Sequence, residues 1–170
     1  MSRRPFIALA LAAATLPLFI APPTDAQVAP TWTPHGSLCA RGEVVIFSCG
    51  IGRKMISVCG DRRGGPHAQY RFGLPGDVEL AWPGPGQNSR LLYMREPLSG
   101  SDALRIMFTN GGYDYAVYHG IARNSTATSD GVMVSRGGRL LSIRACTTPV
   151  RADARSDDYL QEGPRMAWPR

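Results

Sequence analysis

The sequence lacks the motifs on which most recognisable active sites are built. It has only three histidines, His35, His67 and His119, and the Gly-x-Ser-x-Gly elbow of many hydrolases does not occur. Glycine patterns that hold nucleotide phosphates are also missing. These absences exclude the familiar hydrolase and nucleotide-binding classes, and they predict a protein without a cofactor or a bound metal.

Lysine is almost absent as well. Lys54 is the only lysine among 19 basic residues, and with 13 acidic residues the formal net charge is +6. A modest positive field favours anionic partners such as an envelope polymer. The arginines are scattered, apart from Arg62 and Arg63, which makes nucleic acid an unlikely partner and is also typical of a solvated surface.

Long apolar runs are scarce: the only one is Phe6–Ile20, and it follows Arg3 and Arg4. Its length of about 15 residues is short of the roughly 20 that a membrane-spanning helix needs. Small residues around Ala26 complete the pattern of a signal peptide, residues 1–26, with Ala21 as a second cleavage position. The paired arginines fit either general secretion or the twin-arginine route. We therefore expect a bacterial protein that is periplasmic or secreted.

Cysteine is limited to four residues, Cys39, Cys49, Cys59 and Cys146. An even number of cysteines in an exported chain predicts disulfides. A zinc site is the alternative, but the regular ten-residue spacings fit no common ligand pattern.

No apolar stripe of helical period runs through the chain after the leader, whereas short apolar segments separated by glycine turns recur. This pattern predicts an all-β domain at 39–146, built as an antiparallel meander of about eight strands. An extended leader at 27–38 precedes it, and an irregular tail at 147–170 follows. The residues at 98–106 have room for one helical turn. The expected strands are Glu43–Cys49, Lys54–Cys59, Gln69–Gly73, Val78–Trp82, Leu104–Thr109, Tyr113–His119, Gly131–Ser135 and Arg139–Cys146.

The first hairpin constrains the disulfides. A turn centred on Gly52 places Val45 opposite Cys59, so Cys49 and Cys59 lie at opposite ends of the hairpin, too far apart to be bridged. Two connectivities remain, and we favour Cys39–Cys59 with Cys49–Cys146. Joining the first and last strands suits a small closed barrel, with a two-sheet sandwich as the alternative.

Three motifs carry a resemblance. Phe47-Ser48-Cys49, Ser57-Val58-Cys59 and Tyr70-Arg71-Phe72-Gly73 are similar to strand motifs of a group of small secreted bacterial proteins of unknown function. Phe108-Thr109-Asn110-Gly111-Gly112-Tyr113 resembles their second half. The resemblance implies export and a β fold, and it carries no catalytic residue.

Aromatic side chains are the main candidates for binding. Tyr70, Arg71, Trp82, Tyr113 and Tyr115 could form a stacking platform for a sugar or a base, whereas packing in the core is the alternative. For catalysis, His119 with Asp114 and a serine is the only triad that the sequence offers, and an exposed strand-end histidine is the simpler interpretation.

The sequence thus favours an exported, non-enzymatic β module that binds an envelope component or an exported protein. A secreted hydrolase with an unrecognised site is the first alternative, and a structural envelope protein is the second.

Overall fold

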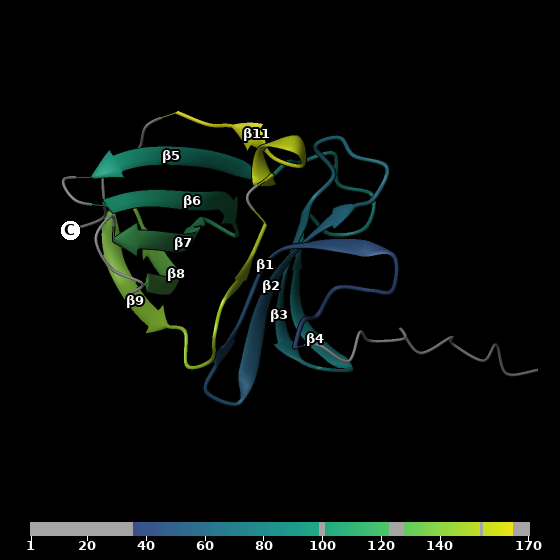
Figure 1. The fold of residues 1–170 in the computed structure, drawn as a ribbon, viewed down its shortest axis with the longest axis horizontal. Coiled ribbons are helices and arrows are strands. Elements are labelled where there is room, and N and C mark those ends of the chain that lie inside the picture. Colours follow the sequence, from purple (N-terminus) through teal and green to yellow (C-terminus); the bar gives the residue numbers. More distant parts are fainter. Residues whose placement is uncertain (1–35, 99–100, 123–127, 154, 165–170) are drawn as a thin grey trace, which may run out of the picture.

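The computed structural model describes residues 36–98, 101–122, 128–153 and 155–164, and within them the protein is all-β (Figure 1). The expected signal peptide, His35 and Trp168 lie outside the described residues. Among the described residues, no helix has the length and apolar character needed to cross a membrane. The elements are β1 (Glu43–Ile51), β2 (Lys54–Asp61), β3 (Gln69–Leu74), β4 (Asp77–Trp82), β5 (Leu92–Leu98), β6 (Ser101–Asn110), β7 (Tyr113–Ala122), β8 (Thr128–Arg136), β9 (Arg139–Ala145), β10 (Arg151–Ala152), the short 3-10 turn η1 (Ser156–Asp158) and β11 (Gln161–Glu162).

These strands form two sheets. The first has the order β10-β1-β2-β3-β4, and the second has the order β11-β5-β6-β7-β8-β9. Each contains an antiparallel meander of consecutive strands, as the glycine turns predicted. The described strands do not close into a barrel, because β4 has no neighbour on its outer side and the chain begins a second sheet at β5.

Some elements differ from the sequence-based expectation. The β5 strand is absent from the eight strands that were expected, and residues 101–106 belong to β6 rather than to a helical turn. The Val45–Cys59 pair of the first hairpin is confirmed, but a bulge between Val45 and Phe47 shifts the remaining pairs by one residue. A bulge adds one residue to one strand, which a pattern of apolar residues does not reveal.

The core lies between the two sheets. Phe47, Val58, Tyr70 and Trp82 form one row across the first sheet, and all four are buried. From the second sheet, Phe108 stacks on Trp82 with 4.7 Å between ring centroids. Phe108 and its aromatic neighbours therefore join the two layers by ring contacts as well as by burial of apolar surface.

Two disulfides fasten different parts of this structure. The Cys49–Cys146 bridge links β1 of the first sheet to the residue after β9 of the second sheet. The Cys39–Cys59 bridge links the segment before β1 to β2. Both are the pairs that we favoured among the two connectivities left open by the hairpin register. The described residues contain no free cysteine.

The segment after Cys146, for which we expected irregular structure, adds one short strand to each sheet. It pairs with β1 through β10 and with β5 through β11, which is parallel to β5. In Figure 1 this yellow segment runs from the end of β9 along β1 to β11. Tyr159 and Leu160, between these two short strands, are buried in the common core. Residues 147–153 and 155–164 of the tail therefore belong to the folded domain.

Candidate functional site

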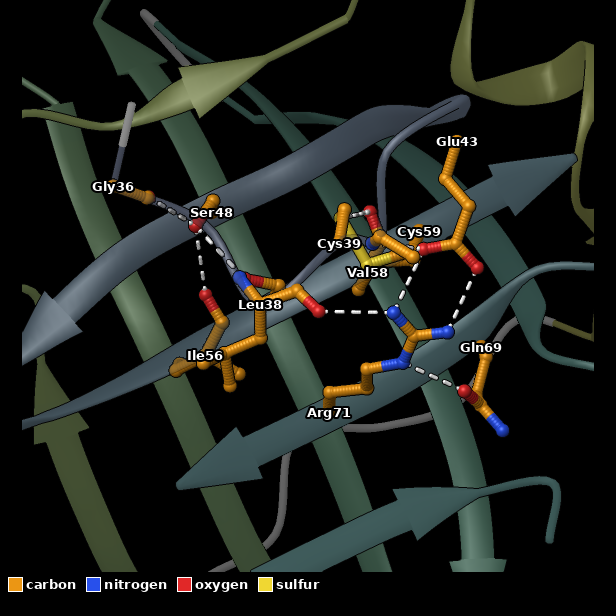
Figure 2. Close-up of a disulfide and its surroundings, with 12 residues drawn as sticks. Gly36, Leu38, Cys39, Glu43, Ser48, Ile56, Val58, Cys59, Gln69 and Arg71 are labelled. Carbon is orange, nitrogen blue, oxygen red and sulfur yellow. Dashed lines mark hydrogen bonds and ion pairs between the residues drawn. A yellow bond between two sulfur atoms is a disulfide. The ribbon is translucent and has the colours of Figure 1, made fainter. Parts of the chain in front are cut away.

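The outer face of the first sheet is covered by the segment that precedes β1. Ser48 and Ser57 are paired on neighbouring strands, and their hydroxyl oxygens lie 2.9 Å apart. Ser48 donates to the carbonyl of Gly36, and the Leu38 N–H donates to Ser57 Oγ at 2.8 Å. Both serines are buried, so these bonds satisfy polar groups that would otherwise destabilise the fold. Figure 2 shows this network beside the Cys39–Cys59 bridge.

Arg71 continues the same row onto β3, opposite Ser57. Its Nη1 donates to the Leu38 carbonyl at 2.9 Å and to Glu43 Oε2 at 2.7 Å, and its Nη2 donates to Glu43 Oε1 at 2.7 Å. The pair is bidentate, the strongest arrangement for an arginine and a carboxylate. With 16% of the Arg71 side chain and 26% of the Glu43 side chain exposed, water screens it only in part.

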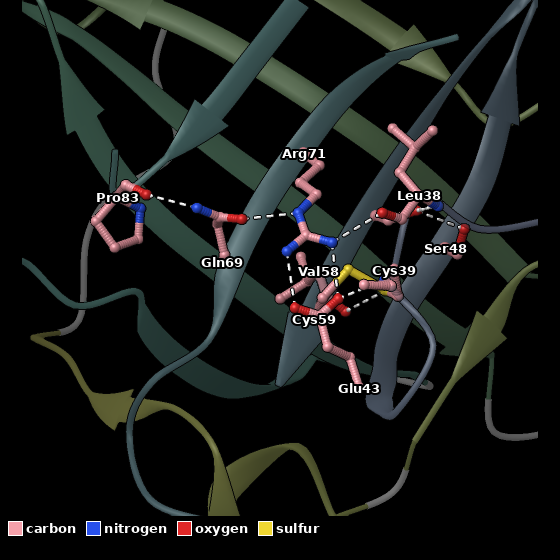
Figure 3. Close-up of polar contacts among 11 residues, drawn as sticks. Leu38, Cys39, Glu43, Ser48, Val58, Cys59, Gln69, Arg71 and Pro83 are labelled. Carbon is pink, nitrogen blue, oxygen red and sulfur yellow. Dashed lines mark hydrogen bonds and ion pairs between the residues drawn. A yellow bond between two sulfur atoms is a disulfide. The ribbon is translucent and has the colours of Figure 1, made fainter. Parts of the chain in front are cut away.

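Further contacts carry this network to the opposite side of Arg71. Its Nε donates to Gln69 Oε1 at 2.7 Å, and Gln69 Nε2 donates to the Pro83 carbonyl at 2.8 Å. Figure 3 shows Arg71 between Gln69 and Pro83 on one side and Glu43 and Leu38 on the other. The network therefore links the chain before β1, the start of β3 and the segment after β4.

A polar cleft of about 290 Å³ lies at this junction. Its walls combine side-chain amides, a hydroxyl, a carboxylate and basic groups, and no phenylalanine, tyrosine or tryptophan lines it. One wall is the segment after β4, where the Gly84 N–H donates to Gln87 Oε1 at 2.7 Å. The lining residues are Glu43, His67, Ala68, Gln69, Arg71, Pro83, Gly84, Gln87, Asn88, Ser89 and Arg90.

The basic side chains of the cleft differ in whether they are free to bind a ligand. Arg71 is engaged by Glu43, Gln69 and the Leu38 carbonyl, which leaves it little capacity for a ligand. Arg90 is exposed and forms no ion pair within the described part of the chain. His67 is also exposed. The cleft thus offers a guanidinium, an imidazole and several amides for hydrogen bonds.

One group of potential metal ligands adjoins the cleft. The sulfurs of Cys39 and Cys59 and a carboxylate oxygen of Glu43 lie within 4.8 Å of one another. However, metal binding by cysteine requires the thiolate, and these sulfurs are joined to each other. Both Glu43 oxygens also accept hydrogen bonds from Arg71. In the oxidised protein this group does not supply the donors that a metal ion needs.

The aromatic residues proposed as a binding platform are mostly in the core. Tyr70 is 2% exposed and Trp82 is 9% exposed, and both rings pack on Phe108. Tyr115 also stacks on Phe108, with 4.7 Å between centroids. Burial raises the pKa of Tyr70 above its ordinary value. Tyr70 and Trp82 are therefore core residues, whereas Tyr115 is only partly buried and packs on Phe108 at the border of the core.

The remaining two members of the proposed platform lie apart from each other. Tyr113 is exposed at the start of β7, where the Arg136 guanidinium lies 5.1 Å from its ring centroid. Arg71 lies in the polar network on the outer face of the first sheet, and the structure does not bring the two together.

His119 forms neither the triad considered as an alternative nor the exposed strand end that the sequence favoured. His119 Nδ1 lies 2.5 Å from Asp130 Oδ1, and the Asp130 side chain is almost completely buried. Asp114, the acid considered for this role, instead accepts a hydrogen bond from Thr109. The His119 ring also contacts Phe47 edge-on, with 6.3 Å between centroids. His119 is thus a partly buried histidine paired with an aspartate across β7 and β8, not an exposed strand-end residue.

A hydrolytic site would be easier to build in the cleft, where Glu43, His67 and Ser89 share the lining. Yet Glu43 already accepts from Arg71 and from the Ala40 N–H. Within the ranges that the structure describes, no hydrogen bond joins the His67 ring to a serine or a carboxylate. The base and its orienting acid are therefore not arranged as nucleophilic catalysis requires.

Sequence reasoning missed most of this site. Arg71 was predicted as a binding residue, but its partner Glu43 is 28 residues away in the sequence. The outer-face row of Ser48, Ser57 and Arg71 could not be derived from the sequence, because the expected register places Ser57 opposite Phe47. Only the bulge between Val45 and Phe47 brings Ser57 opposite Ser48.

Comparisons with protein-family models, with curated proteins and with solved structures found no match for this chain. The motifs behind the resemblance nevertheless have a clear place in the fold. Phe47, Val58 and Tyr70 face the core, and Ser48, Ser57 and Arg71 form the buried polar row on the other face. These motif residues hold the first sheet together from both sides.

Proposed function

We propose that this protein is an exported β-sandwich module, without enzymatic activity, that binds an anionic envelope polymer in the cleft between β3 and the 83–90 segment. The cleft itself carries this proposal. Its lining of amides, an imidazole and an exposed guanidinium suits a hydroxyl-rich, negatively charged ligand. The absence of phenylalanine, tyrosine and tryptophan from the lining argues for hydrogen bonding and charge rather than for stacking.

Arg90 is the residue that we expect to contact the negative group. It is exposed at the cleft, while the guanidinium of Arg71 is held by Glu43 and positions the wall. The excess of basic over acidic residues, which persists after removal of residues 1–26, adds a weak attraction at longer range.

Export is supported by two observations. Two disulfides are stable in an oxidising compartment, and the N-terminal pattern of residues 1–26 fits a signal peptide. We propose a periplasmic or secreted location, with Gln27 as the first residue after cleavage. The mass of the protein recovered from its bacterial host tests the cleavage position. Export that fails when Arg3 and Arg4 are both changed to lysine supports the twin-arginine route, and unchanged export supports general secretion.

Binding can be tested with a defined polymer. The oxidised protein is titrated by calorimetry with an oligosaccharide of uronic acids and, separately, with a neutral glucan of the same length. We expect binding of the acidic oligosaccharide only, with a loss of about tenfold or more in affinity for Arg90→Glu.

The matched control is Arg53→Glu, which makes the same charge change in the exposed turn between β1 and β2. Equal weakening by both variants would show a general charge effect and contradict the assignment of the cleft. No binding of either oligosaccharide would favour the structural alternative, and turnover of a bond in the bound polymer would favour the hydrolase.

A further inference from the structure

The second sheet ends in a strand whose outer side has no neighbour among the described strands. This strand is β9, seven residues from Arg139 to Ala145, paired only with β8. An edge strand of this length presents a row of backbone N–H and C=O groups that another chain can use.

The side chains of β9 add an apolar surface to this edge. Only three large apolar side chains are exposed in the described part of the chain, and two of them, Leu141 and Ile143, are on β9, with exposed fractions of 43% and 54%. Many proteins protect such an edge with charged residues or proline, but here the centre of the strand is apolar.

The charged side chains of β9 are all positive. Arg139 and Arg144 are exposed near the two ends of β9, and the strand contains no acidic residue. Arg136 lies opposite Arg139 on β8 and is also exposed. Neither Arg139 nor Arg144 forms an ion pair within the residues described. The edge therefore combines open backbone groups, apolar side chains and positive charge.

The register orders these side chains by face. Arg144 lies opposite the core residue Val132, and Ile143 lies opposite Met133 on the other face. A strand added beside β9 would thus meet arginine on one face of the sheet and an apolar side chain on the other. Such a strand is complementary when acidic and apolar residues alternate.

We propose that β9 is a docking edge for an extended acidic segment of another exported protein, which adds to the second sheet as a further strand. Main-chain hydrogen bonds to β9 provide affinity, and the alternation of acidic and apolar residues provides specificity. This surface is distinct from the cleft beside β3, so the two proposals stand or fall separately.

A second copy of this chain is a poorer partner. Pairing of β9 with itself brings the arginines of two strands close together, which costs energy. The edge strand of the first sheet at β4 carries Asp77 and Glu79, but Glu79 is already paired with Lys54 at 2.7 Å. Charge complementarity therefore favours a separate acidic segment.

The test uses three labelled nonapeptides and the oxidised protein, with binding followed by fluorescence anisotropy. The first alternates glutamate and valine, the second has the same composition with all glutamates before all valines, and the third alternates lysine and valine. We expect binding of the first peptide at least about tenfold tighter than that of the others. Backbone amides of β9 should then show slower hydrogen exchange.

Two kinds of variant locate the site. Arg144→Glu and Ile143→Lys change exposed side chains and should each weaken the first peptide about tenfold, whereas Arg53→Glu should have little effect. Equal affinity for the alternating and block peptides, or unchanged binding by both β9 variants, would overturn the proposal. Self-association on ultracentrifugation that Glu79→Lys abolishes would also overturn it, in favour of pairing between β9 and β4.

Discussion

The two faces of the first sheet are both buried, but by different interactions. On the inner face, Phe47, Val58 and Tyr70 pack against the second sheet. On the outer face, Ser48, Ser57 and Arg71 bond to the segment before β1. An apolar contact weakens gradually when volume is lost, whereas a buried polar network depends on every partner. The comparison shows how one small sheet supports a core on one side and a positioned polar site on the other.

The largest expected loss of stability follows from removal of the Cys49–Cys146 disulfide. Cys49–Cys146 has a sequence separation of 97, against 20 for Cys39–Cys59. In the chain-entropy model, Cys49→Ser with Cys146→Ser should lower the free energy of unfolding by about 5 kcal/mol, and the other pair of serines by about 3. Urea denaturation of the two double variants measures both values. Equal losses would show that strain or residual structure, rather than loop length, determines the stabilisation.

The polar network on the outer face can be disrupted by substitution of its central residue, Arg71. Arg71→Met keeps the apolar stem but leaves the Glu43 carboxylate and the Leu38 carbonyl without their donors. We expect a loss of about 3 kcal/mol in the free energy of unfolding, because a partly buried charge is left unpaired.

Adding Glu43→Gln to Arg71→Met should recover part of this loss, since the unpaired charge is removed. The four proteins of this double-mutant cycle give the coupling energy directly from denaturation curves. A coupling energy near zero would mean that the pair behaves like an exposed ion pair.

A third substitution tests the close contact between Gly73 on β3 and the start of β4. Gly73 has a φ of +150°, and a Cβ there would lie 2.3 Å from the Asp77 carbonyl oxygen, a backbone atom that cannot move aside. Gly73→Ala should therefore cost about 2 kcal/mol through backbone strain. Gly52→Ala, where the glycine has positive φ but open space around it, is the control and should cost less. Thermal unfolding of both variants gives the comparison, and similar shifts would indicate that φ alone matters.

The smallest expected effect on stability concerns the ion pair between Arg95 and Asp157, a residue of the tail. Arg95 donates to Asp157, and this hydrogen bond holds the pKa of Asp157 below its ordinary value. A lowered carboxyl pKa gives stabilisation that is present above the pKa of the unfolded chain, about 4, and is lost as the pH falls through the folded value. Because the pair is nearly half exposed, we expect less than about 1 kcal/mol. Asp157→Asn should reduce the acid sensitivity of stability between about pH 5 and pH 2, and an unchanged pH profile would contradict this role.

Much of the fold could be predicted because its signals are local. The glycine turns and β-branched runs of residues 43–145 indicate the hairpins, and the register of the first hairpin excludes Cys49–Cys59. The division into two sheets has no such signal, because the choice between pairing β4 with β5 and starting a new sheet depends on packing. The same holds for β10 and β11, which are two residues long and exist only because β1 and β5 offer edges.

The candidate site was predictable only in part. The aromatic residues were predicted as a binding platform. However, the exposure of a side chain cannot be inferred from an alternating pattern when both faces of the strand are covered. Tyr115 and Trp82 pack on Phe108, whereas Glu43 and Gln69 meet at Arg71 from distant positions.

By itself, the sequence determined the all-β class, the hairpins and the exclusion of a Cys49–Cys59 bridge, since each follows from side-chain alternation and turn chemistry within about 20 residues. Only the tertiary structure decided which polar residues meet, which rings are buried and which edge stays open. Those outcomes depend on how two sheets and a tail pack together, and the contacts that decide them join residues far apart in the chain.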